Sequence, residues 1–155
     1  MKAYLGIDPG KQGAVCIIYP DEIETYKCPK KTIDMSSIIR TYINTCTIED
    51  YESIVGIEKV WAQPTNGTRH AFAFGTNYGM WLGVLGSNRI EPNFILPSKW
   101  QKTYREGKGL SKEYLERKRE LKAIAQKYVD FNVTLVTADA ILIAKYLKEE
   151  LNEDE

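Results

Sequence analysis

The sequence predicts an α/β protein with a five-stranded mixed sheet, made of a three-strand antiparallel meander and two parallel strands and flanked by helices. Two observations carry this prediction. The first 28 residues hold three strand-like stretches separated by short turns that contain Pro or Gly. Further along the chain, segments with helical apolar spacing alternate with two short apolar runs. With 155 residues, 43% of them hydrophobic, we expect one domain over residues 1–155.

The meander is predicted from three extended stretches near the N-terminus. Residues 2–8 (KAYLGID) form an apolar run that ends at Asp8, and the following PGKQG supplies a turn. Residues 14–19 (AVCIIY) form a second apolar strand, and after a Pro-Asp turn residues 22–28 (EIETYKC) alternate as a third. Strands joined by such short turns pair in antiparallel fashion.

The rest of the chain alternates between the two kinds of element. Residues 33–45 carry apolar side chains at helical spacing, and residues 53–60 form a short apolar strand that ends near Glu58. The remaining predicted elements are a helix with many small residues at 70–88, a short strand at 93–97, a short helix beginning in 97–104, a long basic helix at 112–129 and a last helix at 137–151.

Charge is distributed unevenly along the chain. The 21 basic and 21 acidic residues give a formal net charge of zero, which does not by itself indicate a nucleic-acid-binding protein. The segment from Lys99 to Lys127, however, holds ten basic and four acidic residues, and the tail at about 148–155 holds one basic and five acidic residues. The basic segment fits either a nucleic-acid contact or a solvated helix face.

The cysteine pattern favours a reducing compartment. Cys16, Cys28 and Cys46 are an odd number and lack metal-site spacing, so we expect free, partly buried thiols in the cytoplasm. We expect no signal or transit peptide, because the N-terminus already reads as a strand. We also expect no membrane partner, because no apolar run approaches the ~18 residues that a transmembrane helix needs.

Three acidic residues fall at the ends of predicted elements. Asp8 ends the first strand, Glu58 ends the fourth, and Asp139 lies near the start of the last helix among small and apolar residues. Each alone also fits an ordinary role, as a turn cap, an exposed strand end or an acid at a helix N-terminus. If the first and fourth strands pair, Asp8 and Glu58 become neighbours, and such close like charges stay ionised only beside a cation. Carboxylate ligands favour Mg²⁺ or Mn²⁺, and paired ions that bridge a phosphate are typical of phosphodiester cleavage.

Five stretches that include these acids resemble, in the same order, the RuvC-type Holliday junction resolvases, most of all the compact versions carried by bacteriophages. They are GIDPGKQGA, IEKVWAQP, FGTNYG, LPSKWQK and ADAILIA, and the resemblance extends from about Leu5 to about Tyr146. It implies an RNase H-like fold and a homodimer in the cytoplasm of a bacterium or a phage-infected host. The implied activity is Mg²⁺-dependent nicking of symmetrically related strands of four-way DNA junctions, which leaves 5′-phosphate and 3′-hydroxyl ends.

The resemblance also assigns roles to individual residues. It matches Asp8, Glu58 and Asp139 to the family's metal carboxylates, with two Mg²⁺ ions for each active site, Mn²⁺ as a substitute and no small-molecule cofactor. Many relatives carry a fourth acid one helical turn before the last one, but this sequence has Val136 there. Either three carboxylates with water and phosphate suffice, or another acid such as Asp130 takes part.

Aromatic and basic residues complete the expected DNA-binding surface. Trp61 matches an aromatic residue that stacks on unpaired bases at the junction centre, although a buried core tryptophan is the alternative. Lys102 and Lys118 match basic residues near the scissile phosphate, and Lys99 competes with Lys102 for that match. The full set of expected DNA-binding residues is Trp61, Lys99, Lys102, Arg105, Lys108, Lys112, Arg117 and Lys118.

The segment at 70–88 carries an aromatic stripe and a row of glycines. Phe72, Phe74, Tyr78, Trp81 and Leu82 recur about one helical turn apart, a pattern most typical of a core-facing helix. Gly75, Gly79 and Gly83 share one face, which would let another helix approach closely, and the resemblance suggests that this helix contributes to a dimer. The single histidine, His70, is expected to be solvated.

Three other kinds of function remain open. An Asp-x-Gly turn after a first strand also occurs in actin-like ATPases and kinases, but these place the nucleotide between two such domains. The valine at position 136 fits a junction-binding protein that does not cleave. A related nuclease that acts on RNA, flaps, forks or other branched nucleic acid is the third alternative.

Overall fold

The computed structural model describes residues 1–61, 67–104 and 109–150. Its centre is one five-stranded sheet with the strand order β3-β2-β1-β4-β5, which confirms the predicted mixed α/β class. β1 pairs with β2, and β2 with β3, in antiparallel fashion, whereas β4 lies parallel to both β1 and β5. The strands are β1 (Lys2–Asp8), β2 (Ala14–Ile18), β3 (Ile23–Lys27), β4 (Glu52–Glu58) and β5 (Asn93–Ile95).

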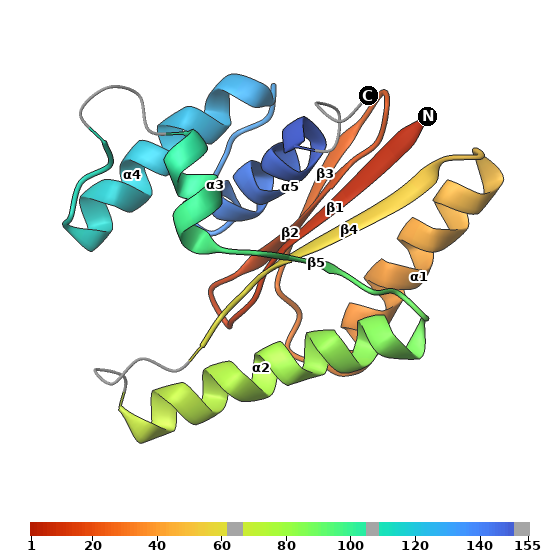
Figure 1. The fold of residues 1–155 in the computed structure, drawn as a ribbon, viewed down its shortest axis with the longest axis horizontal. Coiled ribbons are helices and arrows are strands. Elements are labelled where there is room, and N and C mark those ends of the chain that lie inside the picture. Colours follow the sequence, from red (N-terminus) through yellow and green to blue (C-terminus); the bar gives the residue numbers. More distant parts are fainter. Residues whose placement is uncertain (62–66, 105–108, 151–155) are drawn as a thin grey trace.

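Helices cover both faces of this sheet (Figure 1). One face packs against α1 and α2, and the other against α3, α4 and α5. A short 3₁₀ helix, Gln126–Tyr128, continues α4. The α-helices are α1 (Thr32–Ile48), α2 (Thr68–Ser87), α3 (Pro97–Thr103), α4 (Tyr114–Ala125) and α5 (Ala138–Glu150).

Alternation along β1 divides the core between the two faces. Leu5 and Ile7 face the helices α1 and α2, whereas Tyr4 faces the other layer. At Gly6 the sheet meets α5 closely, because a Cβ added there would lie 2.6 Å from the backbone nitrogen of Ala144. The glycine therefore lets α5 lie directly against β1, and most of α5 is buried.

The structure corrects some details of the sequence prediction. The predicted long helix at 112–129 is shorter, since α4 ends at Ala125. The aromatic stripe of α2 is only partly in the core, because Trp81 is fully buried whereas Phe72 is 78% exposed. The three cysteines are free, as expected, and all are buried. In the described part of the chain no helix has the length and apolar character needed to cross a membrane.

Candidate active site

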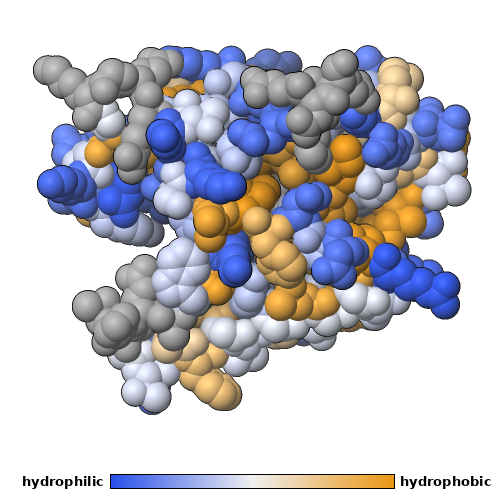
Figure 2. All heavy atoms as spheres, viewed as in Figure 1, coloured by the Kyte–Doolittle hydropathy of each residue, from blue (hydrophilic) through white to orange (hydrophobic). Residues whose placement is uncertain are grey.

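A cavity of about 880 Å³ lies where β1 and β4 end. Its walls come from the β1–β2 turn, the first turns of α2, and parts of α3, α4 and α5. Figure 1 shows this end of the sheet between α4 and the start of α2, and Figure 2 shows the outline of the molecule indented there. The three acids expected from the sequence, Asp8, Glu58 and Asp139, all line this one cavity.

The sheet places two of these acids side by side. β1 and β4 pair in parallel register up to Ile7 and Ile57, so Asp8 and Glu58 end neighbouring strands at the same edge. A strand turns its side chains to alternate faces. Asp8 therefore shares a face with Gly6, which meets α5, and Glu58 shares a face with Gly56, where an added Cβ would meet Leu147 of α5. Both acids thus face the layer that carries Asp139.

The start of α5 brings the third acid to the same place. The Thr134 and Thr137 side chains each accept a hydrogen bond from the other residue's backbone N–H, at 3.1 Å, and so close the turn before α5. The backbone N–H of Ala138 donates to the carbonyl oxygen of Thr134 at 3.1 Å. Asp139 then lies in the first helical turn, where the helix dipole favours an anion, and its side chain is buried as the sequence indicated.

Lys118 of α4 provides the positive partner of Asp139. Its ammonium donates a short hydrogen bond of 2.5 Å to Oδ2 of Asp139. Burial by itself lowers the pKa of Lys118, but the charge and hydrogen bond of Asp139 and the charge of Asp8 outweigh it, so the net pKa is raised. The ammonium is therefore charged. The other carboxylate oxygen of Asp139, Oδ1, is buried and has no hydrogen-bond partner among the residues that the structure describes.

Trp100 of α3 holds the second acid. Its indole Nε1–H donates to Oε1 of Glu58 at 2.8 Å, and the ring is fully buried. Burial raises the pKa of Glu58 to about 7; the charge of Asp139 adds to this rise, while the Trp100 hydrogen bond and the charge of Lys118 oppose it. Glu58 therefore changes its charge near neutral pH.

Asp8 is buried, as is Asp139. Burial raises the pKa of Asp8 well above the usual value of 3.8, and the charges of Asp139 and Glu58 raise it further. Lys118 opposes this shift, but burial and the two neighbouring acids outweigh it. An added cation would lower the pKa of Asp8 and relieve the repulsion between the acids.

The acids do not form a closed ligand cluster. In the described ranges, no three His, Cys, Asp or Glu side chains are grouped closely enough to hold a metal ion as they stand. The hydrogen bonds from Lys118 and Trp100 each occupy one oxygen of Asp139 and Glu58. The unpartnered Oδ1 of Asp139 and the repulsion between the acids nevertheless fit a divalent cation, because hard cations take carboxylate oxygens and keep several waters.

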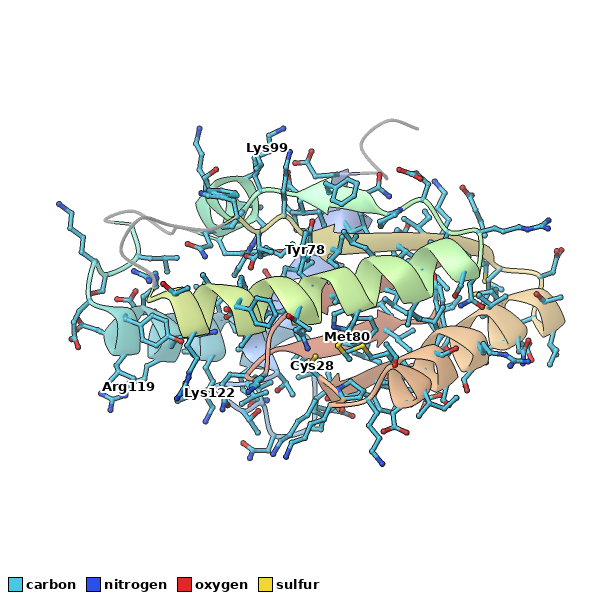
Figure 3. The ribbon with its side chains drawn as sticks, turned by 90° about the horizontal axis from the view of Figure 1, so that it is seen from below. Cys28, Tyr78, Met80, Lys99, Arg119 and Lys122 are labelled. Atoms are coloured by element: carbon cyan, nitrogen blue, oxygen red, sulfur yellow. The ribbon has the colours of Figure 1, made fainter. Side chains whose placement is uncertain are left out.

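The expected basic residues divide into two groups. Lys118 and Arg117 line the cavity, whereas Lys99 and Lys102 are exposed on α3 and do not. Trp100 takes the inward position of α3, so its lysine neighbour Lys99 points outward (Figure 3). Lys112 is exposed before α4. Arg105 and Lys108 lie outside the described residues.

Arg117 has a structural role in addition to its place in the cavity wall. Its Nη1 donates to the carbonyl oxygens of Ser111 and Lys112, both at 3.3 Å, and its guanidinium lies 5.8 Å from the centre of the Tyr114 ring. These contacts hold the chain that leads into α4. They consequently support the position of Lys118, the next residue along the helix.

The remaining sequence expectations have mixed outcomes. Trp61 is 55% exposed, so the alternative of a buried core tryptophan is wrong. Val136 is half-buried and packs against the core, which makes the place of the expected fourth acid apolar. Asp130 does not take part in the cavity, because it lines a separate hollow with the β2–β3 turn, at the other end of the strands from Asp8. His70 is exposed, as expected, and stacks on Phe74.

Two residues of the site were not recognised from the sequence. Trp100 lies in the quoted stretch LPSKWQK, but nothing in the sequence links its indole to Glu58, 42 residues away. Asn77 of α2 is buried, and its Oδ1 accepts the Gly10 N–H at 2.7 Å, which fixes the turn after Asp8. Gly10 has a φ of 119°, a backbone conformation that favours glycine. The sequence signal that could have identified Asn77 is a polar side chain on a largely apolar face of a predicted helix.

The five-stranded mixed sheet with helices on both faces matches the fold of solved structures, which agrees with the predicted fold class. RuvC of Thermus thermophilus matches with a TM-score of 0.60 and 14% identity, over 97% of this chain and 96% of that one. The same protein in complex with a Holliday junction substrate matches with a TM-score of 0.59 and 14% identity, over 98% and 97%. No protein-family model matches the sequence, and neither does any curated protein.

Proposed function

We propose that this protein is a Holliday junction resolvase, a metal-dependent endonuclease that nicks symmetrically related strands of four-way DNA junctions. The observation that carries the proposal is the convergence of Asp8, Glu58 and Asp139 on one cavity, with Lys118 beside them. The RuvC-like fold, and the junction DNA bound to one RuvC structure, support the choice of substrate. The proposed products carry 5′-phosphate and 3′-hydroxyl ends.

In this proposal the three acids hold divalent metal, Mg²⁺ with Mn²⁺ as a substitute, and two ions for each site. Asp139 offers its unpartnered Oδ1, while its Oδ2 stays on Lys118. Glu58 is oriented by Trp100, and Asp8 by the turn that Asn77 fixes. Bound metal would activate water and neutralise charge on the phosphate. A bound cation would favour the ionised form of the acids, while Trp100 and the turn held by Asn77 would orient them.

The cationic residues have proposed roles that follow from their positions. Lys118 would stabilise negative charge that develops on the phosphoryl oxygens. Arg69 and Arg117, on opposite walls of the cavity, would bind the neighbouring backbone phosphates. Trp61 would stack on unpaired bases near the crossover. The other proposed DNA contacts are those that the resemblance implies: Lys112, Lys99 and Lys102 of α3, Arg105 and Lys108.

The proposal also includes the setting in which the protein works. We place it in the cytoplasm of a bacterium or a phage-infected host, as a compact nuclease of the bacteriophage type that spans residues 1–155 as one domain. It would act as a homodimer, because a four-way junction has approximate twofold symmetry and two sites can address two opposed strands. The acidic tail would be a solubilising segment.

Cleavage of a labelled synthetic four-way junction tests the proposal. The reaction is run with Mg²⁺, Mn²⁺ or EDTA, beside a linear duplex, a flap and an RNA–DNA hybrid. We expect paired, metal-dependent nicks in opposed strands of the junction alone. Asp8→Asn should reduce cleavage at least ~100-fold and leave junction binding within about twofold, and Asp130→Asn, a matched change outside the cavity, should cleave like the wild type.

Two outcomes would replace the proposal. Similar nicking of all branched substrates would indicate a broader structure-selective nuclease. Tight junction binding without cleavage in either metal would indicate a junction-binding protein, a function favoured by the open arrangement of the acids and by Val136. Loss of binding together with cleavage in Asp8→Asn would show that the acid is structural.

A further inference from the structure

We propose that four lysines bind the sugar–phosphate backbone of a DNA arm that leaves the active site. They lie around the end of the β1–β2–β3 meander at which the β1–β2 turn lies and β3 ends. These residues, Lys11, Lys27, Lys30 and Lys31, are here called the hairpin-end lysines. The proposal rests on the proposed function, because it assigns a path to the substrate of that site. It adds a contact surface next to the cavity, at the β1–β2 turn that carries Lys11.

Strand pairing gathers these lysines although they are spread over 21 positions of the sequence. Lys27 pairs with Ala14 at the end of β2, and the backbone N–H of Cys28 donates to the carbonyl oxygen of Gly13 at 3.0 Å. Lys11 lies in the turn just before Gly13. Lys30 and Lys31 follow within three residues of Cys28, and Lys31 is the N-cap residue of α1. The backbone positions of the four lysines therefore lie around one end of the sheet.

That end is the end that carries the acids. Asp8 pairs with Ala14, so the strand position of Lys27 is two strands away from Asp8 along the same edge. Lys11 itself lines the cavity together with Lys118. Buried Cys28 lies next to Asn77, which fixes the turn after Asp8. Figure 3 shows Cys28 and Lys122 of α4 on the same side of α2, away from Lys99.

The charge of this surface is uncompensated. All four side chains are exposed, and none forms an ion pair with an acid among the described residues. The turn and strand from Pro9 to Tyr19 contain no acidic residue, and the first acid after Lys31 is Asp34 in the first turn of α1. Exposed lysines beside the cavity that holds the three acids fit a polyanion, and the regular spacing of duplex phosphates lets several lysines bind at once.

The position of the lysines favours a DNA arm over a small anion. Three of the four lie outside the cavity lining, so a ligand that reaches both them and the acids must extend beyond the pocket. Lys118 of α4 and Lys11 of the β1–β2 turn both line the cavity, so a DNA strand that passes the acids would contact both of these lysines. The cut phosphate would lie between two basic surfaces and the arm would continue over Lys27 and α1.

The test compares two variants of equal charge. The hairpin-end variant carries Lys27→Gln, Lys30→Gln and Lys31→Gln, none of which lines the cavity or makes a side-chain capping bond. The control variant carries Arg40→Gln, Arg89→Gln and Lys148→Gln, which lie on the exposed face of α1 or line hollows away from the acids. Binding of a four-way junction is measured in Ca²⁺ over a series of salt concentrations, with hydroxyl-radical protection of the arms.

We expect the hairpin-end variant to bind more weakly, with a slope of log K against log salt that is smaller by about 0.9 for each phosphate that the variant no longer neutralises. Its protected region on the arm should also be shorter, while the control variant should match the wild type in slope and protection. Equal slopes and footprints for the two variants would overturn this inference and leave the proposed function standing, provided that the wild type cleaves the junction. A wild type that binds no branched DNA would overturn both.

Discussion

Asp8 and Glu58 are buried acids whose raised pKa values have a consequence for stability. Glu58 has a usual pKa of 4.5 and a pKa of about 7 in the folded protein, so the unfolded chain releases this proton first as the pH rises. The contribution of Glu58 to stability is therefore complete below about pH 4.5, falls from there to about pH 7 and stays lower above it. Asp8, also raised, acts in the same direction.

At the residue scale we accordingly predict that Glu58→Gln stabilises the metal-free protein at pH 8. One pKa unit corresponds to about 1.4 kcal/mol, so the gain should reach a few kcal/mol at most. Urea unfolding in EDTA between pH 4 and pH 8 measures it. Wild-type stability should decline over this window and the variant should decline less.

The control for this prediction lies on the same strand. Glu52 begins β4 and is exposed at the opposite end from Glu58, so Glu52→Gln should leave the pH profile unchanged. Saturating Mg²⁺ should restore wild-type stability at pH 8 and have little effect on Glu58→Gln. A wild-type profile that rises between pH 5 and pH 7 in EDTA would contradict the assignment of a raised pKa.

Asn77 connects an element to the site. Through it α2 holds the β1–β2 turn, because its Oδ1 accepts the Gly10 N–H at 2.7 Å in a buried position. Replacing Asn77 by Leu leaves this N–H without its partner, which should lower the free energy of unfolding by about 1–3 kcal/mol. The neighbouring Thr76→Ala removes only an exposed hydroxyl that bonds within α2, and should cost less than ~0.5 kcal/mol. Thermal or urea unfolding compares the two, and equal effects would refute the role given to Asn77.

The contact between β1 and α5 gives a second prediction at the scale of elements. In Gly6→Ala the new Cβ would lie 2.6 Å from the backbone nitrogen of Ala144, so β1 and α5 must separate. We expect a loss of about 1–3 kcal/mol in the free energy of unfolding. Separation of these elements should also move Asp8 away from Asp139 and lower cleavage.

Gly75→Ala provides the matched control, measured in dilute solution. A Cβ there meets nothing within 4 Å, and alanine is a better helix residue than glycine by about 0.5–1 kcal/mol. The same chemical change should therefore destabilise the protein at position 6 and stabilise it at position 75. A stable, fully active Gly6→Ala protein would show that the contact is less close than described.

At the scale of the whole molecule, α2 presents an outer face that packs against nothing in the described chain. Phe72 is 78% exposed, and a Cβ at Gly75, Gly79, Gly83 or Gly86 would meet no atom within 4 Å. The proposed homodimer would bury this face against a second copy. Phe72→Ser with Gly79→Arg should then raise the dimer dissociation constant at least ~10-fold, because it adds charge and removes apolar area.

Sedimentation velocity over a range of protein concentrations measures this effect. Ile33 is also a large exposed apolar residue, but it lies on α1, so Ile33→Ser serves as the control and should dimerise like the wild type. If the double variant and the control dimerise equally, α2 is not the interface. The variant should still bind metal, since Phe72 and Gly79 do not line the cavity.

Much of the fold could be read from the sequence because its signals are local. The limits of β1 agree with the predicted 2–8, since an apolar run that ends at a Pro-Gly turn has few alternatives. The three acids were found because each ends or begins an element in an otherwise apolar setting. The helix limits were less accurate, as at α4, which ends at Ala125 and is followed by a 3₁₀ helix at Gln126–Tyr128.

The sequence by itself determined the order of elements, the mixed sheet and the candidate acids, because hydrophobic periodicity and turn residues act over a few positions. Only the tertiary structure decided what surrounds those acids. It brought Lys118 to Asp139 and Trp100 to Glu58, left Lys99 and Lys102 outside the cavity, and gathered the hairpin-end lysines. Strand pairing and helix packing join residues that are tens of positions apart, and no local pattern records which of them meet.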